Sequence, residues 1–106
     1  MKLNIYSIYD SAAKAYMSPF FMHNHGLAIR AFSDQVNSQQ ENQIKNHPEQ
    51  FTLFMIAEYN DQSGYITPLE TPAPLGKGNE FQTQETLTSS VKDQLIQEIK
   101  LLLTEK

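Results

Sequence analysis

The chain has 106 residues, of which 40% are hydrophobic and 19% charged, and its formal net charge is −4. This length suits one folded domain, and the absence of cysteine excludes disulfides, thiolate metal sites and cysteine nucleophiles. Residues 1–50 hold four basic and four acidic side chains, whereas residues 51–106 hold four basic and eight acidic ones. Strong non-specific binding of phosphates is therefore disfavoured, and any DNA contact is expected in residues 1–50.

The N-terminal region predicts a central strand followed by a turn. Residues 2–9 are rich in β-branched and aromatic types, with apolar side chains on both faces. Residues 12–16 predict a short helical turn that ends before Pro19, because the residue preceding proline avoids helical angles. The stretch "PFFM" fits either a second short strand or a buried connection. The N-terminus lacks a secretory signal, and no apolar run is long enough to span a membrane, so we expect a soluble protein.

Residues 25–37 predict an amphipathic helix with Asn24 as its N-cap. Six apolar side chains fall within an arc of about 200°, which suits a helix lying on a sheet. They are Leu27, Ala28, Ile29, Ala31, Phe32 and Val36. On the polar side Asp34 follows Arg30 by one turn, so Arg30 is either part of a surface ion pair or available for a phosphate or carboxylate.

The central region predicts a loop and a hairpin. Residues 37–50 are polar and predict an exposed loop with room for a short helix. Residues 51–59 are the clearest strand in the chain, and residues 60–64 are a turn that leads to the partner strand "YITPL". Pro68 makes that partner an edge strand or ends it. Residues 70–84 predict an extended surface segment or linker, since they contain two prolines and two glycines and show almost no periodicity.

Residues 88–104 predict a C-terminal amphipathic helix with an apolar stripe that includes Val91, Leu95, Ile99 and Leu102. This stripe packs either on the domain's own sheet or on a second copy of the chain, which would give a homo-oligomer such as a dimer. The predicted organisation is a single α+β domain at residues 1–84 and the helix at residues 85–106. Its expected fold is a small, mostly antiparallel sheet packed by one central helix.

No catalytic or metal-binding motif is present. His23 and His25 lack the further ligands that zinc requires, and no HExxH pattern occurs. The chain also lacks a GxSxG elbow, and "GKG" at residues 76–78 lacks the spacing of a phosphate-binding loop. We expect no enzymatic activity, no cofactor and no metal.

Rings and cations are concentrated near the N-terminus, where they have two interpretations. Aromatic rings beside cations hold single-stranded nucleic acid by stacking on its bases, but the same rings are equally typical of a core and its margin. Phe20 and Phe21 are expected in the core, because the adjacent helix needs packing partners. The expected nucleic-acid contacts are Lys14, Tyr16 and Arg30, with Lys2 in support.

Four blocks in order, "IYDSAAKAYMSPFF", "AIRAFSDQVN", "HPEQFTLF" and a Y-N-D-x-x-G turn, resemble the small nonstructural protein of gokushoviruses, which are bacteriophages with single-stranded DNA genomes. The resemblance implies a nonstructural accessory of viral DNA replication that assists the switch to single-stranded genome synthesis. It implies a location in the cytoplasm of the infected bacterium and absence from the mature virion. The expected partner is single-stranded viral DNA or a viral or host replication protein. The alternative is a self-associating adaptor with no direct DNA contact.

Overall fold

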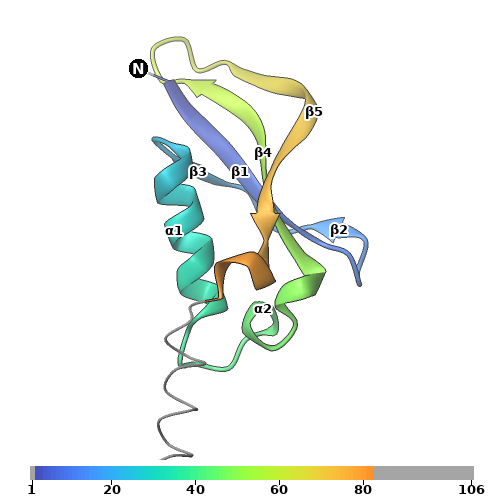
Figure 1. Cartoon of the computed structure of the whole chain (residues 1–106). Coiled ribbons are helices and arrows are strands. Elements are labelled where there is room, and N and C mark those ends of the chain that lie inside the picture. The colour runs from blue at the N-terminus through green and yellow to red at the C-terminus, as the bar shows by residue number, and fades with distance from the viewer. Residues whose placement is uncertain (1, 83–106) are drawn as a thin grey trace, which may run out of the picture.

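A computed structural model of the protein describes residues 2–82 (Figure 1). Its elements are β1 (Lys2–Asp10), β2 (Ala15–Tyr16), β3 (Phe20–Met22), α1 (His25–Val36), α2 (Gln43–Asn46), η1 (Pro48–Gln50), β4 (Phe51–Asn60), β5 (Ile66–Lys77) and η2 (Gly78–Phe81), where η marks a 3-10 helix. The fold is α+β, which confirms the predicted small antiparallel sheet with one main helix.

The predicted C-terminal helix, residues 88–104, lies outside the described residues. Its apolar stripe of Val91, Leu95, Ile99 and Leu102 lies there with it, as does the expected domain boundary after residue 84. These expectations therefore stay predictions.

The sheet is built around β1, as the apolar side chains on both of its faces predicted. On one side β1 pairs with β2 and β3 in turn, and on the other side it pairs with β4, which pairs with the edge strand β5. Every pair is antiparallel. The middle of β1, from Ile5 to Ile8, is buried throughout.

A β-bulge in β4 changes which of its side chains share a face. Ile5 pairs with Ala57 and Tyr6 pairs with Met55, so Ile56 has no partner on β1. Because side chains alternate along β1, Ile5 and Tyr6 point to opposite faces, and their partners on β4 do the same. Tyr6 and Met55 belong to the main core, whereas Ile5 and Ala57 are buried outside it.

Helix α1 covers one face of the sheet and forms the core there (Figure 1). Asn24 is the N-cap, as predicted, and its side chain accepts a hydrogen bond from the Leu27 amide at 2.9 Å. Ala28, Phe32 and Val36 are buried against the sheet, but Leu27 is 42% exposed, so its assignment to the buried face was wrong. Neither α-helix of residues 2–82 is long and apolar enough to cross a membrane.

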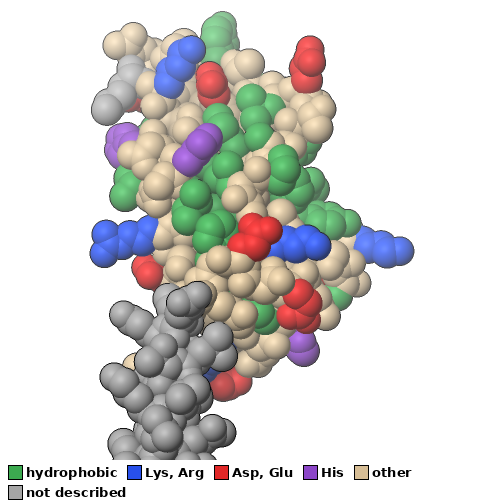
Figure 2. Space-filling view, viewed as in Figure 1, with side chains coloured by type: hydrophobic (Ala, Val, Ile, Leu, Met, Phe, Trp, Pro, Cys, Tyr) green, Lys and Arg blue, Asp and Glu red, His purple; other side chains and the backbone are tan. Residues whose placement is uncertain are grey.

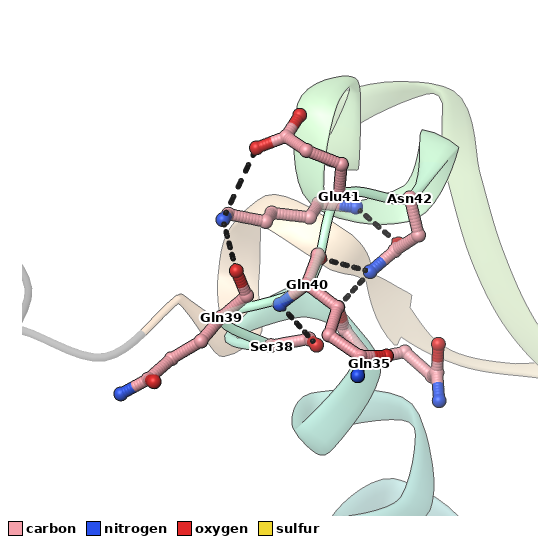
Figure 3. Close-up of polar contacts among 7 residues, drawn as sticks. Gln35, Ser38, Gln39, Gln40, Glu41 and Asn42 are labelled. Atoms are coloured by element: carbon pink, nitrogen blue, oxygen red, sulfur yellow. Dashed lines mark hydrogen bonds and ion pairs between the residues drawn. The ribbon is translucent and has the colours of Figure 1, made fainter.

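The loop between α1 and β4 contains the short helix for which its sequence left room. Asn42 caps α2 by accepting a hydrogen bond from the Lys45 amide at 2.8 Å (Figure 3). The same side chain donates to the carbonyl oxygens of Gln35 and Gln40, each at 3.2 Å. Lys45 also forms an ion pair with Glu41 at 3.6 Å. One asparagine thus joins the end of α1 to the start of α2.

Residues 11–14 form a turn between β1 and β2, so the predicted helical turn over residues 12–16 was wrong. The Asp10 carboxylate accepts hydrogen bonds from the amides of Ala12 and Ala13, as short acidic side chains do in turns. Lys14 then adopts a left-handed conformation with φ of 55°. This reverses the chain and lets Tyr16 pair with Tyr9.

Strand β5 runs on through residues 70–77, about half of the segment that was expected to be an extended surface segment or linker. Pro68 lies opposite Ala57 and Pro74 lies opposite Phe54, with a register shift between these two pairs. Prolines are tolerated here because β5 is an edge strand, whose outer side needs no hydrogen-bond donor. Pro68 therefore marks an edge strand as predicted, but it does not end the strand, and residues 70–77 are part of the sheet.

The segment after β5 closes the core at the end of α1. The Phe81 ring contacts Phe32 at a centroid distance of 5.7 Å, and the Asn37 side chain donates to the Phe81 carbonyl oxygen at 2.9 Å. Gly78 is buried directly against Pro48, and a Cβ at this position would lie 2.5 Å from the Pro48 carbonyl oxygen. Only a residue without a side chain fits this contact.

We expect Gly78→Ala to lower the free energy of unfolding by about 1–3 kcal/mol, because the added methyl group must displace backbone atoms. Urea denaturation followed by circular dichroism measures this change. Asn79→Ala is the control, since Asn79 is exposed next to it, and its effect should stay within about 0.5 kcal/mol. Equal stability of Gly78→Ala and the wild type would contradict the close approach to Pro48.

Candidate nucleic-acid interface

The face of the sheet turned away from α1, which we call the open face, carries a cluster of three rings. The cluster consists of Tyr9 of β1, Tyr16 of β2 and Phe54 of β4. The ring centroids are 4.8 Å apart for Tyr9 and Tyr16, 5.8 Å for Tyr16 and Phe54, and 6.4 Å for Tyr9 and Phe54. Their place on this face follows from the pairing, because Tyr9 lies opposite Tyr16 and Phe54 lies opposite Ser7, two residues before Tyr9. Tyr16 is 49% exposed, so its ring is accessible to a ligand.

A second pair of rings lies farther along the open face. Phe21 of β3 and Tyr59 of β4 contact each other with centroids 5.5 Å apart. Phe21 is 47% exposed and lies opposite Ile5 in the sheet, so its expected place in the core was wrong. Phe20, its neighbour, faces the other way and stacks on Tyr6 at 5.8 Å, which confirms the expectation for that residue.

Two lysines lie at the end of the open face that carries the three-ring cluster. Lys14 is exposed in the turn that precedes Tyr16, and Lys77 lies opposite Thr52, which in turn lies opposite Tyr9. Asp10 and Glu58, the acidic residues that take part in the pairing within residues 2–82, belong to the other face. Exposed Glu70 of β5 follows Leu69, which packs on the core, so alternation places Glu70 on the open face. This end of the face therefore combines accessible rings with two lysines, one of which, Lys77, has the Glu80 carboxylate beside it, since its amide donates to Glu80 at 3.3 Å.

The expected set of Lys2, Lys14, Tyr16 and Arg30 is only partly brought together. Lys14 and Tyr16 lie side by side in the β1–β2 hairpin. Arg30 is exposed on α1, on the side away from Ala28 and Phe32 and hence away from the sheet. Lys2 lies at the opposite end of β1, where its ammonium pairs with the Glu58 carboxylate at 3.7 Å. Figure 2 shows that the Lys and Arg side chains visible in that view do not gather in one patch.

Arg30 and Asp34 do not form the ion pair that their spacing suggested; the ion pairs found within residues 2–82 are Lys2–Glu58 and Lys45–Glu41. Arg30 is therefore an exposed cation on the outer surface of α1. It lies on the other side of the sheet from Tyr16.

Sequence reasoning missed Lys77, Phe54 and Tyr59 as parts of this surface. Lys77 was assigned to an extended surface segment or linker, although Ala73 and Leu75 have the period-two spacing of a strand and both pack on the core. In a regular strand Phe54 and Tyr59 would point to opposite faces, because they are an odd number of residues apart. The bulge at Ile56 places them on the same face, and no local signal in the sequence marks that bulge.

His25, one of the two histidines of the N-terminal region, has a structural role. His25 Nδ1 lies 2.7 Å from the hydroxyl of buried Tyr6, which also accepts a hydrogen bond from Asn4 at 2.9 Å. Within residues 2–82 no group of three His, Asp or Glu side chains is arranged to hold a metal ion. His25 is thus part of the contact between α1 and the sheet.

Comparison with known proteins gives one finding. The model of the family described as "Phage ORF5 protein" matches residues 3–81, which include the whole open face. No curated protein and no solved structure matches the chain.

We expect Tyr16 and Phe54 to be energetically coupled, because contacting aromatic rings contribute about 0.5–1.5 kcal/mol beyond their buried area. A double-mutant cycle with Tyr16→Ala and Phe54→Ala, measured by urea denaturation, gives this coupling directly. The control cycle combines Tyr16→Ala with Phe21→Ala, which belong to separate ring clusters, and should show additive effects. Additivity in the first cycle would contradict the three-ring cluster.

Proposed function

The chain belongs to the Phage ORF5 protein family, and we propose that it is a nonenzymatic accessory of phage DNA replication that binds single-stranded DNA through its open face. The resemblance to the gokushovirus nonstructural protein supports this assignment. In this proposal the protein acts in the cytoplasm of the infected bacterium, assists the switch to single-stranded genome synthesis and is absent from the mature virion. Its partners are single-stranded viral DNA and the replication proteins bound to that DNA.

The observation that carries the proposal is the three-ring cluster beside Lys14 and Lys77. Bases of a single strand stack on aromatic side chains, and each stack is worth about 1–3 kcal/mol. Tyr16 is the most accessible ring of the cluster, and Lys14, two residues before it, provides a charge for the adjoining phosphate. Within residues 2–82 the paired positions of this face carry no carboxylate, which favours the approach of a DNA strand there.

The same surface disfavours duplex DNA and stoichiometric coating. In a duplex the faces of the bases are stacked on one another, so the rings of the open face have nothing to stack on. Two lysines neutralise at most two phosphates, which limits the slope of log K against log salt to about −1.4 for a single strand. A net charge of −4 further opposes close packing of many copies along one strand. The proposed mode is weakly salt-dependent binding dominated by stacking.

The second candidate function is an adaptor that binds a replication protein, or a second copy of the chain, without touching DNA. It is favoured by the apolar character of the part of the open face farthest from Lys14. Phe21 and Ile66 are there 47% and 59% exposed, and exposed apolar surface of this kind marks protein contacts as well as ligand sites.

We expect the protein to bind a fluorescently labelled oligothymidylate, with Tyr16→Ala weakening the affinity about 5-fold or more through the loss of a stack. Lys14→Asn should weaken binding and reduce the salt slope by about 0.7, through the loss of one phosphate contact. Asparagine is chosen because it tolerates the left-handed conformation of Lys14 and so preserves the turn. Fluorescence anisotropy at two salt concentrations measures both effects.

Arg30→Ala is the matched control, because it also removes one exposed cation but from the far side of the sheet. Its affinity and salt slope should equal those of the wild type. An Arg30→Ala defect as large as that of Lys14→Asn would place the DNA elsewhere. The absence of binding at low salt would leave the adaptor as the remaining function.

A further inference from the structure

We propose that Phe21 and Tyr59 form a second base-stacking subsite, so that one DNA strand runs along the open face and uses both ring clusters. This inference rests on the proposed function and specifies its ligand: a single-stranded segment of about three to five nucleotides. The three-ring cluster of Tyr9, Tyr16 and Phe54 is the first subsite, and the lysines lie beside that cluster alone.

The bulge at Ile56 places the two ring clusters on the same face of the sheet. Before the bulge Phe54 points to the open face, and after it Ala57 and Tyr59 do so as well, because the alternation has shifted by one residue. The contact of Tyr59 with Phe21 confirms its direction. Between the clusters this face carries Ile5 and Ala57, which are uncharged and each only 4% exposed.

The spacing of the clusters determines the length of the ligand. Phe54 and Tyr59 lie opposite Ser7 and Leu3, which are four residues apart on β1, so the clusters are separated by about 13 Å at about 3.3 Å per residue. A strand with the duplex rise of about 3.4 Å per nucleotide covers this distance with about five nucleotides, and a more extended strand needs fewer. Dinucleotides are therefore too short to occupy both subsites.

The second subsite lacks a cation. The nearest lysine at this end of β1, Lys2, is paired with Glu58, and both belong to the face that carries α1. A base stacked on Phe21 thus adds affinity without an additional phosphate contact. The expected signature is a gain in affinity with strand length that leaves the salt slope unchanged, because only phosphate contacts release counterions.

The test uses the full chain and competition by unlabelled oligothymidylates of two to eight nucleotides. For the wild type, affinity should rise steeply up to about five nucleotides and then level off. Phe21→Ala should remove this rise, which lowers affinity for the longer strands about 5-fold or more and leaves the dinucleotide unaffected. Its salt slope should equal that of the wild type, in contrast to Lys14→Asn.

Two further variants control for misfolding and for the general loss of an exposed apolar side chain. Phe21→Leu keeps the apolar bulk but removes the ring, so it should show the same loss of length dependence. It therefore tests the ring even if Phe21→Ala is poorly folded. Leu27→Ala is the matched control, because Leu27 is similarly exposed, at 42%, but lies on α1. It should leave the length dependence intact.

The outcomes separate the two proposals. Length-dependent binding that both Phe21 variants retain would overturn the second subsite and leave the proposed function standing. A failure of every oligonucleotide to bind would overturn the proposed function, and this inference with it. A change in oligomeric mass of the Phe21 variants at unchanged affinity would show that this part of the open face contacts another copy instead of DNA.

Discussion

The β-bulge at Ile56 determines how this sheet divides its side chains between core and surface. On one side of the bulge the odd-numbered residues of β4 pack under α1, and on the other side the odd-numbered residues point to the open face. The core therefore extends only as far as α1 covers it. The rings beyond that point, Phe21 and Tyr59, form a surface and are not a continuation of the core.

The balance between rings and charges shapes the proposed activity. A protein that held DNA mainly by phosphate contacts would need several cations on one surface, whereas this one presents Lys14 and Lys77 beside a cluster of rings. Stacking provides affinity that salt hardly affects and that any base can provide. Such binding suits a factor that contacts exposed single strands briefly during replication and leaves them free for packaging.

Much of the fold could be predicted from the sequence, because local patterns determine it. The central strand, the helix capped by Asn24 and the β4–β5 hairpin follow from residue type and periodicity. The surface was harder to predict, because it depends on long-range pairing. Residues 70–77 belong to an edge strand, but their prolines are untypical of strands and so obscure the pattern. The bulge at Ile56 has no local signature in the sequence. Lys14 and Tyr16 were recognised as a pair, but only the topology shows that Arg30 lies behind the sheet.

The central claim is that single-stranded DNA stacks on the open face, and NMR titration of the isotope-labelled protein with an oligothymidylate tests it most directly. The account predicts shifts of the aromatic resonances of Tyr9, Tyr16, Phe21, Phe54 and Tyr59, all of which lie on that face. The amide resonances around Arg30 on the far side of the sheet should stay in place. Shifts confined to α1, or no shifts in any ring of the open face, would contradict the account.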